Sequence, residues 1–293
     1  MQRALVVAAV LLAILWCSAW WPAHPWLAVV GAVLLLFGYA LVLALELVLL
    51  ATAGHEPATP RPRLPQLLAA WGAEVAHDLR VFAWRQPFAW RRVADHLPTE
   101  AAGRPGVVFV HGFVCNRGFW TPWLQQARQR GVPFVAVNLE PVFGSIDDYA
   151  GTIEQAVVRV TAATGRAPVL VCHSMGGLAA RAWSRRHAGT ARVAHVVTIG
   201  TPHHGTWLAR FSRLPNGRQM QVGGDWLDEL HRDGVPAPGT FTCWYSNCDN
   251  VVFPPSTATL AQADNRLVQG VAHVQLAFHP RVMRETWDLL QQP

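Results

Sequence analysis

The sequence contains no lysine, and charged residues make up only 14% of its 293 residues. So small a charged fraction is low for a wholly soluble protein. All of the basic side chains other than histidine are arginines, and the formal net charge is +6. The aromatic residues near these arginines suit a membrane interface, and no feature of the sequence indicates nucleic-acid binding.

Cysteine is scarce as well, with five residues at positions 17, 115, 172, 243 and 248. Their spacing matches no metal-binding pattern, and we expect neither a metal site nor an organic cofactor. An odd number argues against a fully paired disulfide framework. A bridge between Cys243 and Cys248 in an oxidising compartment remains an alternative to two free thiols.

Apolar residues are abundant and are concentrated at the N-terminus. They make up 52% of the chain, and two apolar runs cover residues 4–21 and 26–50. At ~1.5 Å per residue the longer run would extend about 37 Å, more than the hydrocarbon core of a bilayer. Residues 22–25 contain two prolines and are flanked by tryptophans. We therefore predict a transmembrane helical hairpin over residues 1–50, with an aromatic belt at its turn.

The charges beside these runs predict the orientation of the hairpin. Arg3 precedes the first run, the turn contains no arginine, and Arg61 and Arg63 follow the second run. Because positive residues favour the cytoplasmic side, both ends should lie there. The chain is therefore predicted to be a multi-pass protein of the inner (cytoplasmic) membrane, with its C-terminal domain in the cytoplasm. Glu46, near the end of the second run, is expected to snorkel or to face the partner helix, and a functional role is the less favoured alternative.

The alternative for residues 1–21 is a signal peptide. Arg3 supplies a minimal basic start, but the bulky Trp20–Trp21 pair makes a poor cleavage site. We therefore favour an uncleaved hairpin.

The segment after the hairpin is rich in proline and then in arginine. We predict a linker over residues 51–66. Residues 67–84 can form an amphipathic helix, either at the membrane interface or as the first packing element of the domain 67–293. The arginines here are opposed only by Glu74 and Asp78, and lie at positions 61, 63, 80, 85, 91 and 92. They indicate contact with an anionic lipid surface or, alternatively, an ordinary solvated face.

From residue 105 onward, short β-rich runs alternate with helical stretches. This alternation is typical of an α/β domain with a mostly parallel sheet and helices on both faces. We predict strands at 107–110, 133–138, 169–172, 193–199, 240–246 and 266–272. We predict helices near 118–130, 147–163, 175–187 and 280–291.

The clearest motif is a strand that runs directly into a helix through a serine, in residues 169–178 (VLVCHSMGGL). The nucleophile of an α/β-hydrolase fold needs this tight turn so that its hydroxyl stands free at the sheet edge. Gly176 and Gly177 avoid clashes there, and the helix dipole points at the oxyanion. Ser174 is the predicted nucleophile. Cys172 replaces the first glycine of the G-x-S-x-G pattern, and as a buried strand residue it is a much weaker candidate.

A second strand ends in Val110-His111-Gly112-Phe113. The backbone after this strand can present an N–H group to the same oxyanion. We predict that the Phe113 and Met175 amides form the oxyanion hole, each contributing about 3 kcal/mol of transition-state stabilisation. His111 is expected to order this loop by hydrogen bonding rather than to act as a base.

The other catalytic residues should follow Ser174 in the order acid, then histidine. His273 follows the last predicted strand and is the expected general base. Asp249 follows the strand at 240–246 and is the expected acid, which would orient the imidazole. Weaker candidates for these two roles are His203, His204, His231, His279, Asp225, Asp228 and Asp264.

The segments VHGF, CHSMGG, IGTPHHGT, NCDNVV and GVAHVQL resemble, in this order, those of bacterial triacylglycerol lipases and related esterases of the α/β-hydrolase superfamily. The resemblance covers roughly residues 105–280. It implies that Ser174, Asp249 and His273 form a catalytic triad beside the oxyanion hole predicted above. It also implies a lid over the acyl site at about 207–236. The alternative is that the apolar residues of this segment pack a peripheral helix.

We therefore predict a serine hydrolase that cleaves a lipid or small carboxylic ester through an acyl-enzyme. An acyltransferase or thioesterase with the same residues is one alternative, and a non-catalytic membrane scaffold is another. The intact set of Ser174, Asp249 and His273 argues against the scaffold.

Overall fold

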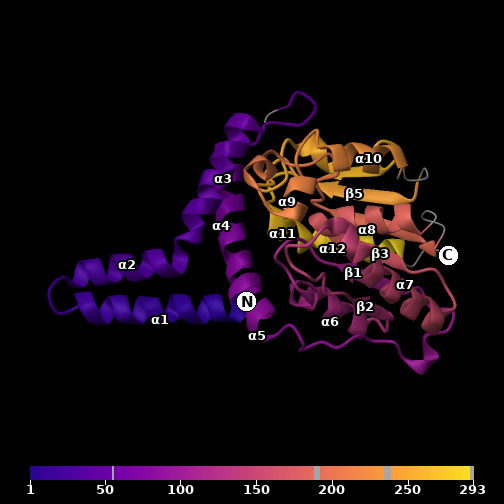
Figure 1. Ribbon diagram of the computed structural model, residues 1–293, viewed down its shortest axis with the longest axis horizontal. Coiled ribbons are helices and arrows are strands. Elements are labelled where there is room, and N and C mark those ends of the chain that lie inside the picture. The colour runs from indigo at the N-terminus through magenta and orange to yellow at the C-terminus, as the bar shows by residue number, and fades with distance from the viewer. Residues whose placement is uncertain (55, 188–191, 234–238, 291–293) are drawn as a thin grey trace.

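The structure, a computed structural model, describes residues 1–54, 56–187, 192–233 and 239–290. Within these residues, six strands form one fully parallel sheet in the order β2-β1-β3-β4-β5-β6 (Figure 1). The strands are β1 Val107–Val110, β2 Phe134–Ala136, β3 Val169–His173, β4 His195–Ile199, β5 Phe241–Tyr245 and β6 Asp264–Leu267. The predicted α/β class is therefore confirmed.

Helices cover both faces of this sheet, because successive strand residues point to opposite sides. On one face Val108 and Leu170 pack against α7 and α8, and on the other face Phe109 packs against α6 and α12. These helices are α6 Thr121–Gln129, α7 Ala150–Thr164, α8 Met175–Arg186 and α12 Pro280–Leu289. Short helical turns complete the domain at η2 Thr99–Ala101, η3 Arg117–Trp120, η4 Ile146–Tyr149 and η7 Pro255–Ala258.

The last strand differs from its prediction. We expected a strand over 266–272, but β6 ends at Leu267 and the chain continues into the short helix α11, His273–Ala277. The N–H groups of Gly270 and Val271 are bound by Asn247 Oδ1 at 2.8 Å and Ser246 Oγ at 3.4 Å. Side chains thus take the donors that a longer strand would have given to the sheet, and His273 becomes the first residue of a helix.

The N-terminal segment forms three helices instead of two. They are α1 Gln2–Trp20, α2 Pro25–Phe37 and α3 Tyr39–Ala53. α1 and α2 make the predicted hairpin, which projects from the domain (Figure 1). The prediction of one helix over 26–50 is wrong, because α2 and α3 meet at Gly38 with a bend of 59°. Glycine favours such a break, and α3 turns away to pack against α4, Leu64–Arg80, where the Tyr39 hydroxyl donates to Val75 O at 3.0 Å.

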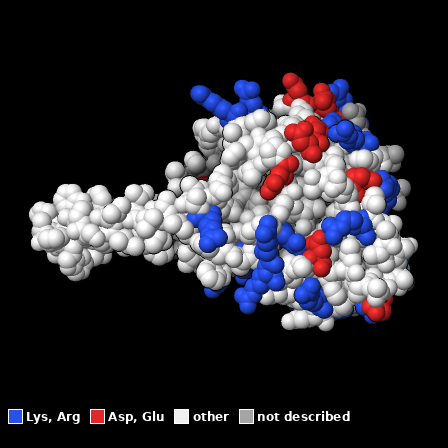
Figure 2. Space-filling view, turned by 60° about the horizontal axis from the view of Figure 1, so that its bottom comes forward, with Lys and Arg blue, Asp and Glu red and all other residues white. Residues whose placement is uncertain are grey.

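The projecting hairpin is apolar and exposed. Residues 4–45 contain no Asp, Glu, Lys or Arg, and the projection in Figure 2 carries neither charge colour along its length. Among the described residues, α1 is the single helix that is long and apolar enough to cross a bilayer alone. The α2 and α3 helices meet that criterion only as a bent pair.

The helix α3 lies against the sheet domain. Leu47 and Leu50 pack with Phe253, and Glu46 Oε2 accepts a hydrogen bond from Asn250 Nδ2 at 2.6 Å. The expectation that Glu46 snorkels or faces its partner helix is therefore wrong. α4 continues into η1 Val81–Arg85 and α5 Gln86–Phe88, and it packs on the domain.

The segment predicted as a lid contains η6 Trp207–Phe211, α9 Pro215–Gln219 and α10 Asp225–Asp233, while its residues 234–236 lie outside the described residues. Leu227 and Leu230 are buried in the core beside α8. Their burial agrees with the alternative interpretation, in which the apolar residues of this segment pack a peripheral helix. Phe211, by contrast, is 69% exposed.

Candidate active site

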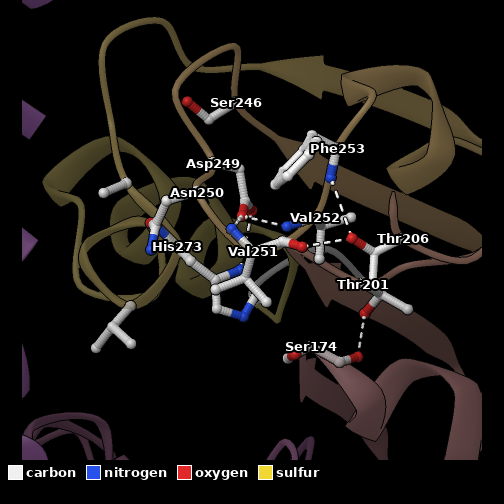
Figure 3. A network of polar contacts seen from close by, with 12 residues as sticks. Ser174, Thr201, Thr206, Ser246, Asp249, Asn250, Val251, Val252, Phe253 and His273 are labelled. Carbon is white, nitrogen blue, oxygen red and sulfur yellow. Dashed lines mark hydrogen bonds and ion pairs between the residues drawn. The ribbon is translucent and has the colours of Figure 1, made fainter. Parts of the chain in front are cut away.

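Ser174 lies in the turn between β3 and α8, in a strained backbone conformation. Its φ of 54° and ψ of −131° lie in a region that a residue with a side chain seldom adopts. Its N–H donates to Ile199 O at 2.9 Å, and its carbonyl oxygen accepts from Thr201 Oγ1 at 2.9 Å. The neighbouring strand β4 and the loop after it thus hold the turn in place (Figure 3).

Glycines allow this turn to approach the end of β1. A Cβ on Gly176 would lie 2.5 Å from Val110 O, and one on Gly112 would lie 2.7 Å from Ser174 Cβ. The loop after β1 therefore contacts the serine directly. Cys172, the other candidate nucleophile, is completely buried, and burial raises its pKa. A neutral thiol inside the sheet agrees with the prediction that Cys172 is inert.

Asp249 and His273 form a buried pair. Asp249 Oδ2 lies 2.9 Å from His273 Nδ1, and Asp249 Oδ1 accepts the N–H groups of Val251 at 3.0 Å and Val252 at 2.8 Å. These three contacts fix the Asp249 carboxyl group as an acceptor. Because Nδ1 then donates to Asp249, Nε2 is left free to accept a proton. Figure 3 shows the imidazole between the Asp249 carboxyl group and Ser174.

His173, the residue before Ser174, joins the serine turn to the histidine. Its Nε2 is 3.3 Å from the carbonyl oxygen of His273, and the centroids of the His173 and His273 rings are 4.6 Å apart. Phe119 stacks on its other side at 4.4 Å. Burial, together with the charge of His273, holds the pKa of His173 well below its usual value. His173 is therefore a neutral packing group, and sequence analysis did not identify it.

The backbone of His273 is also held. Its N–H donates to Asn250 Oδ1 at 3.1 Å, and Asn250 in turn donates to Glu46 of α3. Glu74 of α4 is 1% exposed and accepts the N–H groups of Val274 at 2.6 Å and Gln275 at 2.9 Å. Helix α4 thus binds the start of α11 directly, and α3 is linked to it through Asn250.

The contact of Glu74 with α11 was not predicted, and for Glu46 a functional role was only the less favoured alternative. A signal was present for Glu74, because it lies on the helix predicted at 67–84 among apolar residues that were expected to pack. Burial raises the pKa of Glu74 well above its usual value, and the charge of Asp78 adds to this, while the two N–H groups oppose it. The two N–H groups favour the ionised form, but burial outweighs them.

The two predicted oxyanion donors, the Phe113 and Met175 amides, follow Gly112 and Ser174 in the chain. Met175 is the first residue of α8, so its N–H has no carbonyl in a preceding turn to bind. Phe113 follows Gly112, and its ring packs on Phe143 with centroids 5.9 Å apart. The next residue, Val114, has a positive φ of 53°, which bends the loop sharply.

His111 orders the same loop, as predicted. Its Nδ1 donates to Gly112 O at 2.9 Å, and its Nε2 accepts the N–H of Leu139 at 3.1 Å. Burial lowers the pKa of His111 to about 4. A neutral ring with both nitrogens engaged leaves no site for base catalysis.

The weaker candidates lie elsewhere in the described residues. His203 is buried against Thr198 and Cys243, His204 stacks on His231 at 4.4 Å, and Asp264 pairs with Arg266. Asp225 and Asp228 lie on α10, and His279 caps α12. All five cysteines are free thiols, including Cys243 and Cys248. The described part of the chain contains no cluster of His, Cys, Asp or Glu able to hold a metal ion.

Similar sequences include two bacterial triacylglycerol lipases. One is from Pseudarthrobacter phenanthrenivorans, and the chain is 38% identical to it over 125 residues. This aligned stretch covers 39% of this chain and 38% of that protein. The chain is also 38% identical over 125 residues to one from Burkholderia plantarii, covering 39% of this chain and 34% of that protein. The chain thus matches well under half the length of these curated relatives.

Similar solved structures are lipases of the same fold. The mature lipase BlEst2 of Bacillus licheniformis has a TM-score of 0.58 at 19% identity, over 66% of this chain and 95% of that chain. Lipase B of Aspergillus fumigatus has a TM-score of 0.58 at 16% identity, over 97% of this chain and 76% of that chain. At sequence identities this low, the similarity to these structures shows only a shared fold. The sequence pattern of one family matches residues 107–289, more than half of the chain, and the protein therefore belongs to the alpha/beta hydrolase family.

Proposed function

We propose that this protein is a membrane-anchored serine hydrolase that cleaves carboxylic esters, with lipid esters as its main substrates. One observation carries the proposal. The buried pair of Asp249 and His273, joined at 2.9 Å, lies beside a strained serine at the start of α8. The triacylglycerol lipases and lipase structures similar to this chain support an ester as substrate.

The proposed reaction has two steps. His273 Nε2 takes the proton of Ser174 Oγ, and the oxygen attacks the ester carbonyl to form a tetrahedral intermediate. The Phe113 and Met175 amides stabilise the oxyanion. The intermediate collapses to an acyl-enzyme as the leaving alcohol takes the proton from His273. Water, activated by the same histidine, then attacks the acyl-enzyme, and the carboxylic acid leaves.

Asp249 would act on the imidazole without reacting itself. Its hydrogen bond to Nδ1 selects the tautomer with a free Nε2 and stabilises the imidazolium that forms in each step. Its second oxygen accepts two backbone N–H groups, which hold the carboxyl group in place against the imidazole.

The projecting hairpin of α1 and α2 would anchor the protein in the inner membrane. Its exposed side chains form a continuous apolar surface, and contact between such a surface and water is unfavourable. Arg3, Arg61 and Arg63 would keep both ends on the cytoplasmic side. A reporter fused after residue 293 tests this orientation, and a reporter that is active only in the periplasm would contradict it.

The activity is tested with the full chain in detergent micelles, using p-nitrophenyl esters of increasing acyl length and a fluorophosphonate label. Ser174→Ala should lower kcat by a factor on the order of a million and abolish labelling. Ser184→Ala, a matched change further along α8, should leave both unchanged. Ester hydrolysis that survives in Ser174→Ala would contradict the proposal.

The same experiment separates the alternatives. An acyltransferase would convert the ester into a new ester when an alcohol is added, at the expense of free acid. A scaffold would fold normally and show neither hydrolysis nor fluorophosphonate labelling.

A further inference from the structure

A groove of about 400 Å³ lies where the hairpin joins the domain. Its walls are mainly apolar and come from α1, the end of α2, the start of α3, α4 with η1, and the loop after β1. Among its lining residues are Leu5, Val6, Leu36, Leu79, Phe82 and Val114. Its volume is within the range of small-molecule sites, and it lies apart from the segment predicted as a lid.

The outer end of the groove is continuous with the exposed surface of the hairpin. Leu5 is 62% exposed, Leu36 is 37% exposed and Leu79 is 44% exposed, although all three line the groove. Contiguous exposed apolar surface marks a binding site or a membrane contact. An apolar chain that lay in the groove would therefore pass from the hairpin surface onto the domain without crossing water.

The inner end of the groove lies at the loop that contacts Ser174. Val114 is two residues after Gly112, whose Cα faces the serine side chain. The Val114 carbonyl oxygen accepts a hydrogen bond from Gln2 Nε2 at 2.6 Å, which fixes this loop to the first turn of α1. The groove thus connects the hairpin to the loop that contains Phe113.

The walls of the groove are not entirely apolar. Asp78 also lines it, and Asp78 Oδ1 is buried with no hydrogen-bond partner in the described part of the chain. The groove thus combines one buried carboxyl group with otherwise mainly apolar walls, which match an ester that has a polar head and a long tail.

We propose that this groove binds the acyl chain of the ester that Ser174 cleaves. The tail would lie along α1 and η1, with the carbonyl group at the loop after β1. A lipid would then enter from the hairpin side, while its tail is still in contact with the membrane anchor. This inference rests on the proposed hydrolase function, and it predicts that chain-length preference depends on the hairpin root.

The first test fills the groove with a larger side chain. Ala83→Trp and Leu5→Trp should lower the ratio of kcat/KM for p-nitrophenyl palmitate over butyrate by at least about tenfold, because two displaced methylenes account for that factor. Leu12→Trp, two turns further along α1 and 53% exposed, is the matched control and should keep the wild-type ratio. An unchanged ratio in both groove variants would overturn the proposal.

The second test does not depend on turnover. The full-length Ser174→Ala protein in phosphatidylcholine vesicles is irradiated with a p-nitrophenyl palmitate that carries a diazirine at the end of its chain. Adducts within residues 5–9 or 79–83 are expected, whereas adducts confined to residues 207–233 would overturn the proposal. If the wild-type protein cleaves no ester, the proposed function fails, and the adducts still decide whether the groove binds an acyl chain.

Discussion

The carboxylate of Glu74 accepts the N–H of Val274 at 2.6 Å, one residue after His273. The same carboxylate accepts the N–H of Gln275 at 2.9 Å. A helix that precedes the sheet domain in the sequence therefore binds the N-terminus of α11, whose first residue is the proposed general base. We infer that Glu74 is a positioning residue for His273.

Glu74→Gln tests this role. Glutamine has one carbonyl oxygen, so one N–H group of α11 would lose its acceptor inside the protein. We expect kcat for a short ester to fall about tenfold, the rate equivalent of ~1.4 kcal/mol, which lies within the cost of leaving one buried donor unpaired, with KM nearly unchanged. Kinetics normalised to fluorophosphonate-labelled sites measure this loss in folded protein alone.

The exposed Glu229 on α10 provides the control. Glu229→Gln makes the same substitution at the surface and should leave kcat unchanged. A purely structural Glu74 would behave differently, because Glu74→Gln would then lower the unfolding temperature without changing kcat per labelled site.

Glu46 offers a second test of the link between the N-terminal helices and the site. Glu46→Ala removes the acceptor of Asn250, whose own oxygen binds the His273 N–H. We expect kcat to fall about fivefold, corresponding to ~1 kcal/mol for one hydrogen bond. Glu46→Gln keeps an acceptor and should restore most of the rate. Leu45→Ala, at an exposed neighbouring position, is the control for general damage to α3.

The parts of the structure that sequence analysis predicted correctly are those set by local pattern. The turn at Ser174 follows from a buried strand, two glycines and an apolar helix within ten residues of one another, and the structure has them at β3 and α8. The same reasoning predicted that His111 orders its own loop, and the hydrogen bond to Gly112 O agrees. The catalytic roles of Ser174, Asp249 and His273 remain predictions.

The parts that were missed depend on contacts between distant segments. Glu46 and Asn250 are 204 residues apart in the sequence, and Glu74 and Val274 are 200 apart. The periodicity of apolar residues along the sequence carries no information about pairs that lie so far apart. The bend at Gly38 likewise depends on α4, because Trp71 Nε1 donates to Ala40 O at 2.8 Å at the start of α3. An apolar run alone predicts a straight helix.

Gly200 should be intolerant of any side chain. Its φ is +57°, and a Cβ there would lie 3.0 Å from Asp249 Oδ2 and 3.1 Å from His273 Nδ1. We expect Gly200→Ala to displace this pair and to lower kcat about a hundredfold, as small misplacements of catalytic groups do. It should also lower the free energy of unfolding by about 1–3 kcal/mol because of the backbone strain.

Gly165 separates these two effects. Its φ is +68°, but a Cβ there would meet no atom within 4 Å. Gly165→Ala should therefore destabilise the protein to a similar extent and leave kcat per labelled site unchanged. An equal loss of kcat in both variants would show that strain, and not contact with the Asp249–His273 pair, explains the effect of Gly200→Ala.

Asp78 predicts how stability depends on pH. Burial, and then the charge of Glu46, raise its pKa from 3.8 to about 7, while His273 opposes the shift. Between these pH values the folded protein holds a proton that the unfolded chain has released. Its contribution to stability is therefore fully present below pH ~4 and is lost as pH rises to about 7.

Asp78→Asn removes this dependence, because the amide carries no charge. At pH 8 we expect the variant to have a larger free energy of unfolding than the wild type, by an amount on the order of a few kcal/mol. The difference should vanish only below pH ~3, well under the unfolded pKa of 3.8, where the wild-type carboxyl group is protonated in both states. Thermal unfolding in detergent across this pH range measures both values. A variant less stable than the wild type at pH 8 would mean that the Asp78 charge has a stabilising partner.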